Sequence, residues 1–285
     1  MRNSPAAAGN HPRPSELPMN HIDADGAQIF YRLDGPAELP VLMLSNSLGT
    51  NLSMWDRQVP AFGRHFRLLR YDSRGHGASD APPGPYDIAR LGRDAVALLD
   101  ALGLNRVRYC GLSKGGMVGM WLAANAPERI ERLVLCNTSA HIGNRDIWNQ
   151  RLEIVRTQGM AGIVDGVLER WFTAGFRQRA PDVIAAVRRM LLATPAQGYM
   201  ACGMAIRDMD QRAALASIRA PTLVVCGAHD IATPPDHGRL IAASITGARL
   251  VELDASHLSN IEAEDAFTAA VRDFLMEGDS TAKNW

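Results

Sequence analysis

The chain has 285 residues, 47% of them hydrophobic and 21% charged, which excludes a largely disordered chain and a small scaffold that needs staples to fold. Its 30 basic and 30 acidic side chains cancel, so no global attraction to nucleic acid or to an anionic membrane follows. No apolar stretch reaches the roughly 18 residues of a membrane-spanning helix, and the N-terminus lacks the apolar core of a secretory signal. We therefore expect neither nucleic acid nor a membrane among its partners.

The cysteines and histidines give no sign of a metal site. Cys110, Cys136, Cys202 and Cys226 show no CxxC spacing, and three of them follow strand-like apolar runs, so buried free thiols are expected. The eight histidines show no metal-ligand spacing. We expect a reduced, cytoplasmic protein with no metal and no other cofactor.

Short apolar runs alternate with longer amphipathic segments from residue 20 onward. Before them, residues 1–18 contain four prolines and no periodicity, which predicts a disordered tail, with Met19 as an alternative start. The runs have strand length and end at Gly, Pro, Asn or Asp. They cover residues 28–33, 41–45, 66–72, 107–112, 132–137, 222–227 and 249–254.

Amphipathic helices are predicted between these runs, over residues 87–102, 114–126 and 263–276. Strands that alternate with helices predict an α/β fold, with a mostly parallel sheet and helices on both faces. Several runs are apolar at every position, as expected for strands that are covered on both sides.

One long segment breaks this alternation. Residues 143–212 contain four helical stretches and no convincing strand, and about 70 residues are too many for a loop in a compact domain. We expect an all-α lid here, inserted between core segments 19–142 and 213–285. Such a lid would cover the carboxyl edge of the sheet.

The sequence Gly111-Leu112-Ser113-Lys114-Gly115 matches the motif G-x-S-x-G, between a predicted strand and a predicted helix. In this motif the serine takes a strained backbone conformation that exposes its hydroxyl. Glycines are needed at 111 and 115 because larger side chains would collide across the turn. Ser113 is therefore the predicted nucleophile.

A serine nucleophile needs a base, and the base needs an orienting acid. Asp230 follows the run at 222–227, and His257 follows the run at 249–254, which is the chain order of this motif. Both lie at the sheet edge where Ser113 is expected. Asn137 ends the strand before the lid and is not an acid, which favours Asp230. The weaker candidates for these roles are Asp254, His229, His237 and His76.

The oxyanion of the reaction needs backbone N–H donors, one of them from Lys114, the residue after the nucleophile. The second donor is expected in the loop 45–50, with Ser47 as first choice and Leu48 as second choice. The usual His-Gly pair of this loop reads Ser45-Asn46 here. Two interpretations of Lys114 are open: only its backbone matters and the amine reaches solvent, or the amine stabilises the oxyanion or a substrate carboxylate.

These features together resemble the α/β-hydrolase superfamily, and more closely its 3-oxoadipate enol-lactonases. The resemblance covers roughly residues 20–276. It rests on residues 32–36, 44–56, 70–79, 111–139 and 230–262. It implies the α/β-hydrolase fold and a reaction in which water opens the enol-lactone of 3-oxoadipate, a step in aromatic-compound (protocatechuate or catechol) catabolism.

The implied substrate is a small anionic lactone, whose carboxylate should meet a cation in an otherwise apolar site. Arg145 and Trp148, at the start of the lid, are the predicted contacts; alternatively, both only pack or cap the first lid helix. A carboxylesterase, a perhydrolase or a carbon–carbon hydrolase would use the same triad. A non-catalytic ligand-binding member is less expected because all three triad residues are present. The resemblance also allows a homo-oligomer.

Overall fold

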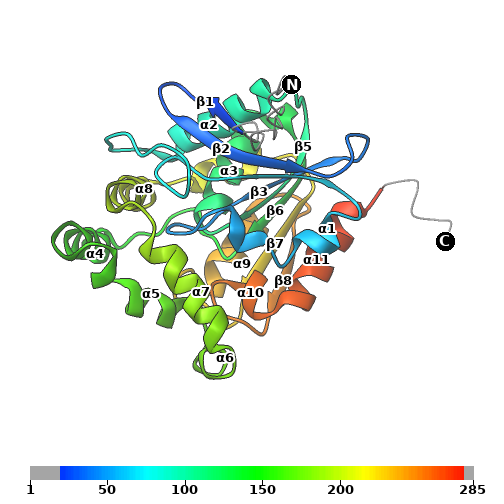
Figure 1. Cartoon of the computed structure of the whole chain (residues 1–285). Helices are drawn as coiled ribbons and strands as arrows, with labels where there is room; N and C mark the ends of the chain where they lie inside the picture. The colour runs from blue at the N-terminus through cyan, green and yellow to red at the C-terminus, as the bar shows by residue number, and fades with distance from the viewer. Residues whose placement is uncertain (1–19, 279–285) are drawn as a thin grey trace, which may run out of the picture.

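The computed structural model describes residues 20–278, so the tail predicted at 1–18 lies outside the described residues. A single eight-stranded sheet runs through the centre of the molecule, with the strand order β1-β2-β4-β3-β5-β6-β7-β8. β2 is antiparallel to both β1 and β4, and the other neighbouring strands pair in parallel. The predicted mostly parallel sheet is confirmed, and Figure 1 shows helices around it.

All seven predicted runs are strands in the structure. The strands are β1 (His21–Asp23), β2 (Gln28–Asp34), β3 (Val41–Ser45), β4 (Arg67–Tyr71), β5 (Val107–Leu112), β6 (Ile130–Cys136), β7 (Thr222–Gly227) and β8 (Arg249–Leu253). The sequence gives no signal for β1, because three residues are too few for a pattern. β1 exists because a tight turn at Asp25 and Gly26, both with positive φ, folds it back onto β2.

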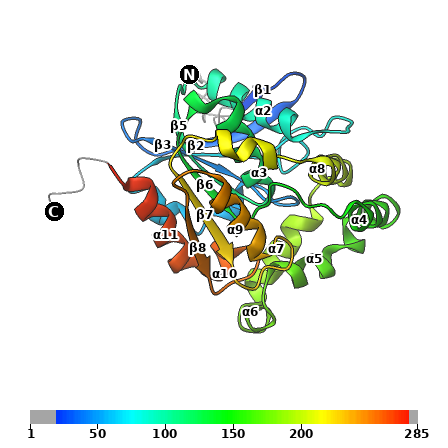
Figure 2. The same ribbon diagram turned by 180° about the vertical axis from the view of Figure 1, so that it is seen from behind.

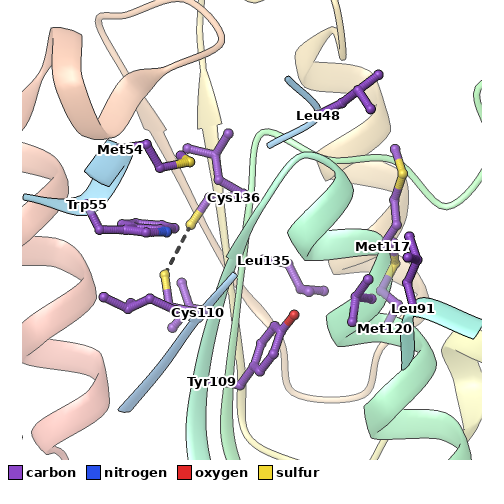
Figure 3. Close-up of a cluster of buried hydrophobic side chains, with 14 of the residues drawn as sticks. Leu48, Met54, Trp55, Leu91, Tyr109, Cys110, Met117, Met120, Leu135 and Cys136 are labelled. Carbon is purple, nitrogen blue, oxygen red and sulfur yellow. Dashed lines mark hydrogen bonds between the residues drawn. The ribbon is translucent and has the colours of Figure 1, made fainter. Parts of the chain in front are cut away.

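The central strands are covered on both faces, as their continuous apolar runs predict. On β5 and β6, the thiols of Cys110 and Cys136 lie 3.8 Å apart and face Trp55 (Figure 3). Tyr109 and Leu135, the neighbours in sequence, point to the other side of the sheet, and all five side chains are buried. The described cysteines are all free.

Helices of the core flank the sheet on both sides (Figures 1 and 2). The α-helices are α1 (Val59–Phe62), α2 (Ile88–Ala101), α3 (Lys114–Asn125), α9 (Pro235–Ser244), α10 (Ser259–Glu262) and α11 (Glu264–Met276). Short 3₁₀ turns are η1 (Leu52–Trp55), η2 (Pro127–Arg129) and η4 (Arg212–Ser217). The three helices predicted by periodicity correspond to α2, α3 and α11. Among residues 20–278, no helix combines the length and apolar character needed to cross a bilayer.

The segment 143–212, called the lid from here on, lies between β6 and β7. It holds five α-helices, where the sequence predicted four: α4 (Arg145–Gln158), α5 (Val164–Trp171), α6 (Ala174–Arg179), α7 (Pro181–Leu192) and α8 (Ala196–Asp208), with the 3₁₀ turn η3 (Met160–Gly162). Thr173 separates α5 from α6, since its side chain accepts a hydrogen bond from the Phe176 N–H as a helix N-cap. Figure 1 shows these helices gathered at one side of the sheet.

Candidate active site

Ser113 occupies the turn between β5 and α3, with φ 57° and ψ −115°, a strained conformation for a residue other than glycine. A Cβ at Gly111 would lie 2.8 Å from the Gly116 nitrogen, and one at Gly115 would lie 2.5 Å from the Ser45 carbonyl carbon. The turn therefore closes only with glycine at both positions. It leaves the Ser113 hydroxyl at the start of α3, facing a cavity.

His257 and Asp230 are joined by a short hydrogen bond of 2.7 Å between Nδ1 and Oδ2. Both side chains are buried, so this ion-pair geometry is shielded from water. With Asp230 ionised, Nδ1 carries the proton and donates it, which leaves the Nε2 lone pair of His257 free to act as a base. Ser113 and His257 line the same cavity. The structure thus brings the three residues predicted from separate strand ends to one place.

The carboxylate of Asp230 is held by four further donors. Asn137 donates to Oδ2 at 3.0 Å and the Thr233 hydroxyl at 2.8 Å, while the N–H groups of Ala232 and Thr233 donate to Oδ1. Burial alone would raise the pKa of Asp230. The charge of His257 and these hydrogen bonds outweigh burial and lower the pKa. Asp230 therefore stays ionised as the partner of His257.

Asn137 and Thr233 are functional positions that sequence reasoning missed. Asn137 has φ 44° and also accepts a hydrogen bond from the Ser259 hydroxyl at 2.6 Å, so it links the ends of two strands. A polar residue at the carboxyl end of a central strand was the available signal. The residue type alone indicates only that no acid ends this strand.

The backbone N–H groups in the loop after β3 differ in their hydrogen bonding. The Ser47 N–H points to the sulfur of Met54 at 3.4 Å, and the Gly49 N–H to His76 at 2.9 Å. Within the described residues, the Leu48 N–H has no hydrogen-bond partner. Ser47 and Leu48 both line the cavity. The hydrogen-bond pattern therefore favours Leu48, the second choice from sequence, as the donor.

The Lys114 side chain follows neither of its predicted readings. It is completely buried and does not line the cavity, so its amine reaches neither solvent nor the oxyanion position. The Nζ atom has no hydrogen-bond partner within residues 20–278. Burial lowers the pKa of Lys114, against the opposing charges of Cys202, Asp72 and Asp94. The side chain belongs to the core beneath the turn.

The cavity that contains Ser113 has a volume of about 400 Å³ and lies between the lid and the carboxyl edge of the sheet. The lid contributes mainly large apolar side chains together with two arginines, Arg151 and Arg170. Burial, and then the nearby charge of Arg151, lower the pKa of Arg170. Neither guanidinium forms a salt bridge with a carboxylate of the described chain.

Of the two substrate contacts predicted in the lid, the structure places Trp148 in the cavity wall and Arg145 outside it. The Arg145 side chain is 65% exposed and pairs with Asp208 at 2.6 Å on the lid surface. Trp148 instead stacks under Arg151, whose guanidinium carbon lies 4.7 Å from the ring centre.

The weaker candidates from the sequence take other places. His229 and Asp254 form an exposed pair with each other at 2.8 Å. His237 lies in the first turn of α9, reaches the cavity wall and hydrogen-bonds to the Ser139 hydroxyl at 2.6 Å. Among residues 20–278, no three His, Cys, Asp or Glu side chains gather closely enough to hold a metal ion.

Comparison with known proteins places this geometry in a family. Residues 40–264 match the family model of the α/β hydrolase fold. The chain belongs to the α/β-hydrolase family. It is 41% identical over 250 residues to 3-oxoadipate enol-lactonase 2 of Acinetobacter baylyi, which covers 88% of this chain and 94% of that enzyme. The crystal structure of the enol-lactonase from Burkholderia xenovorans LB400 superposes with a TM-score of 0.89 at 49% identity, over 90% of this chain and all of that one.

The names of more distant relatives indicate hydrolysis of other kinds of bond. A protein of Agrobacterium fabrum named as a carbamate hydrolase, RutD, is 28% identical over 256 residues, which cover 86% of this chain and 96% of that protein. The family and these relatives together make this chain a hydrolase.

Proposed function

We propose that this α/β hydrolase opens a small anionic enol-lactone, that of 3-oxoadipate, by serine catalysis. The supporting observation is the pair of arginines, Arg151 and Arg170, that share the cavity with Ser113 and His257. Arg151 and Arg170 are half-buried, and two such guanidinium groups in one cavity repel each other unless an anion joins them. A carboxylate can accept paired N–H donors from either arginine. The site is therefore suited to a substrate with an acyl carbon at one end and a carboxylate at the other.

The reaction begins with attack of the Ser113 Oγ on the lactone carbonyl carbon, while His257 Nε2 takes the serine proton. Negative charge develops on the carbonyl oxygen, where the N–H groups of Lys114 and Leu48 receive it. The ring C–O bond then breaks, and the electrons of that bond leave on the enol oxygen. His257 returns the serine proton to that oxygen, which leaves the imidazole neutral again, and the released enol tautomerises to the ketone.

Water completes the cycle. His257 Nε2 removes a proton from a water molecule, whose oxygen attacks the acyl-serine carbon, and the serine leaves with the proton returned by His257. Asp230 holds the imidazole in the required tautomer throughout, because its hydrogen bond occupies Nδ1. The ring opens in the first half of the cycle and the acid is released in the second.

The test compares freshly prepared lactone with its neutral methyl ester, on the wild-type protein and on Ser113→Ala. We expect serine-dependent loss of the lactone, and a much higher kcat/KM for the acid than for the ester. Arg170→Met should raise KM for the acid about 10- to 100-fold, the effect of losing one charge-assisted hydrogen bond of about 1.5–3 kcal/mol. KM for the methyl ester should stay unchanged.

The chain provides a matched control in Arg145→Met. This arginine lies on the same lid but outside the cavity, so its removal should leave KM for the acid unaltered. Equal effects of the two substitutions would contradict the assigned carboxylate site. Full activity of Ser113→Ala would contradict the mechanism. An inert lactone beside a rapidly cleaved carbamate or neutral ester would contradict the proposed substrate.

A further inference from the structure

Gly49, in the loop that follows β3, is held from two sides. Its N–H donates to Nε2 of His76 in the core at 2.9 Å, and its carbonyl oxygen accepts a hydrogen bond from the Thr194 hydroxyl at 3.1 Å. Thr194 is buried and belongs to the lid, two residues beyond the end of α7. Core and lid therefore bind opposite ends of a single residue in the loop 46–50, called the oxyanion loop from here on.

The lid also lies directly against the backbone of Gly49. With φ +79°, Gly49 is in the left-handed region, and a Cβ there would lie 2.5 Å from Leu191 Cδ1 and 3.2 Å from Tyr199 Cε2. Two lid side chains thus occupy the space that a side chain would need. The contact is between lid and loop backbone, which makes the position of the loop depend on the position of the lid.

The residue next to Gly49 is Leu48, which lines the cavity and whose N–H has no hydrogen-bond partner among residues 20–278. In the peptide unit that joins Ser47 to Leu48, the Ser47 oxygen accepts from the Thr50 hydroxyl at 2.9 Å. Since the N–H and C=O of one peptide unit point in opposite directions, this bond turns the Leu48 N–H away from Thr50. The next peptide unit is fixed by the bond from Gly49 to His76. The carbonyl of Gly49, in the peptide unit that follows, is held by the hydroxyl of Thr194.

We infer that Thr194 is a positioning residue, through which the seated lid holds the oxyanion loop so that the Leu48 N–H meets the developing oxyanion. The inference rests on the serine chemistry proposed above, but not on the identity of the lactone. Donors of this kind act only within about 0.5 Å of the required position. Loss of the hydroxyl would release the carbonyl of Gly49 and loosen the loop without removing a group that touches the substrate.

The expected fall in kcat follows from the loss of the Thr194 hydroxyl. Complete removal of one oxyanion donor slows enzymes of this kind by about 100- to 1000-fold. Thr194→Val displaces the donor without deleting it. The hydroxyl also has a second acceptor, the Met190 carbonyl at 3.3 Å, so part of its hydrogen bonding is local to the lid. We therefore expect a fall in kcat of about tenfold, with KM unchanged.

The test uses Thr194→Val, which keeps the shape, and Thr194→Ser, which keeps the hydroxyl. Thr157→Val is the matched control, because the Thr157 hydroxyl bonds to the Glu153 carbonyl at 2.8 Å within its own lid helix. Each variant is assayed with the lactone and with a short-chain nitrophenyl ester. Binding of benzeneboronic acid is measured as well, since its adduct with Ser113 places a negative oxygen at the oxyanion position.

Thr194→Val should lower kcat for both substrates and weaken boronate binding about tenfold, with normal KM. Its melting temperature should fall by only about 2–4 °C, because one buried hydrogen bond of about 1 kcal/mol is lost. Thr194→Ser should restore both quantities, and Thr157→Val should change neither. A Thr194→Val enzyme with normal kcat and normal boronate affinity would overturn the inference. So would a loss that Thr194→Ser does not restore. If only the ester is cleaved, the proposed substrate fails while the comparison of these variants still stands.

Discussion

Lid and core meet backbone to backbone at a pair of glycines. Gly198, in the first turn of α8, faces Gly75, which has φ +82° in the loop after β4. A Cβ on Gly198 would lie 2.5 Å from the Gly75 Cα and 2.6 Å from its carbonyl carbon. Carbon atoms in contact are about 3.5–4.0 Å apart. Gly198→Ala must therefore separate the two backbones by about 1 Å, and neither can rotate out of the way.

The cost can be worked out from these distances. Overpacking costs about 1–3 kcal/mol, and a backbone-to-backbone clash belongs at the upper end of that range. Alanine stabilises a helix by about 1 kcal/mol relative to glycine, which offsets part of this cost. Gly198→Ala should therefore lower the free energy of unfolding by about 2 kcal/mol. Gly166→Ala in α5 is the control, because its Cβ would meet only Arg170 Nη1 at 3.6 Å. That variant should gain up to about 1 kcal/mol.

Urea denaturation of both variants at the same pH measures the difference, which should be about 3 kcal/mol. In a thermal melt each kcal/mol corresponds to about 2–4 °C. The melting temperature of Gly198→Ala should thus fall clearly below that of the wild type, and that of Gly166→Ala should not. If Gly198→Ala is as stable as Gly166→Ala, the two glycines are not in contact, and the reasoning about how the lid is seated fails.

Two further substitutions test the buried polar groups around the site. Asp230→Asn should lower kcat by about 10⁴-fold, because an amide favours the wrong tautomer of His257; a loss below tenfold in steady-state assays would contradict the role of Asp230. Burial, followed by the charge of Lys114, lowers the pKa of His76 well below 6.5. Below about pH 6.5 the unfolded chain therefore binds a proton that the folded chain does not. Stability is lost as the pH falls, by up to about 1.4 kcal/mol per pH unit from this residue. His76→Gln should make urea unfolding at pH 7 and pH 5 differ less than in the wild type, and an unchanged difference would show that His76 is not buried in its neutral form.

Much of this protein follows from its sequence, because the decisive signals are local. Seven strands are short apolar runs with clear ends, and three of the core helices show a simple periodicity. Ser113, Asp230 and His257 each follow a predicted strand. Parallel strands bring their carboxyl ends to one edge, so strand order alone predicts that the three side chains meet. The strand β1 was not predicted, because its three residues form no sequence pattern and it is held in place by pairing with β2.

The lid and its contacts required the tertiary structure. Arg145 and Arg151 stand on the same helix, about 120° apart around its axis at 3.6 residues per turn. Only the way in which α4 docks decides that Arg151 faces the cavity and Arg145 the surface. The burial of Lys114 likewise depends on neighbours distant in sequence, and the preference for Leu48 over Ser47 depends on the hydrogen bond from the Ser47 N–H to Met54, seven residues further along the chain. The strand ends in the sequence thus predicted Ser113, Asp230 and His257 as candidate catalytic residues, whereas the direction of individual side chains was decided by packing between lid and core.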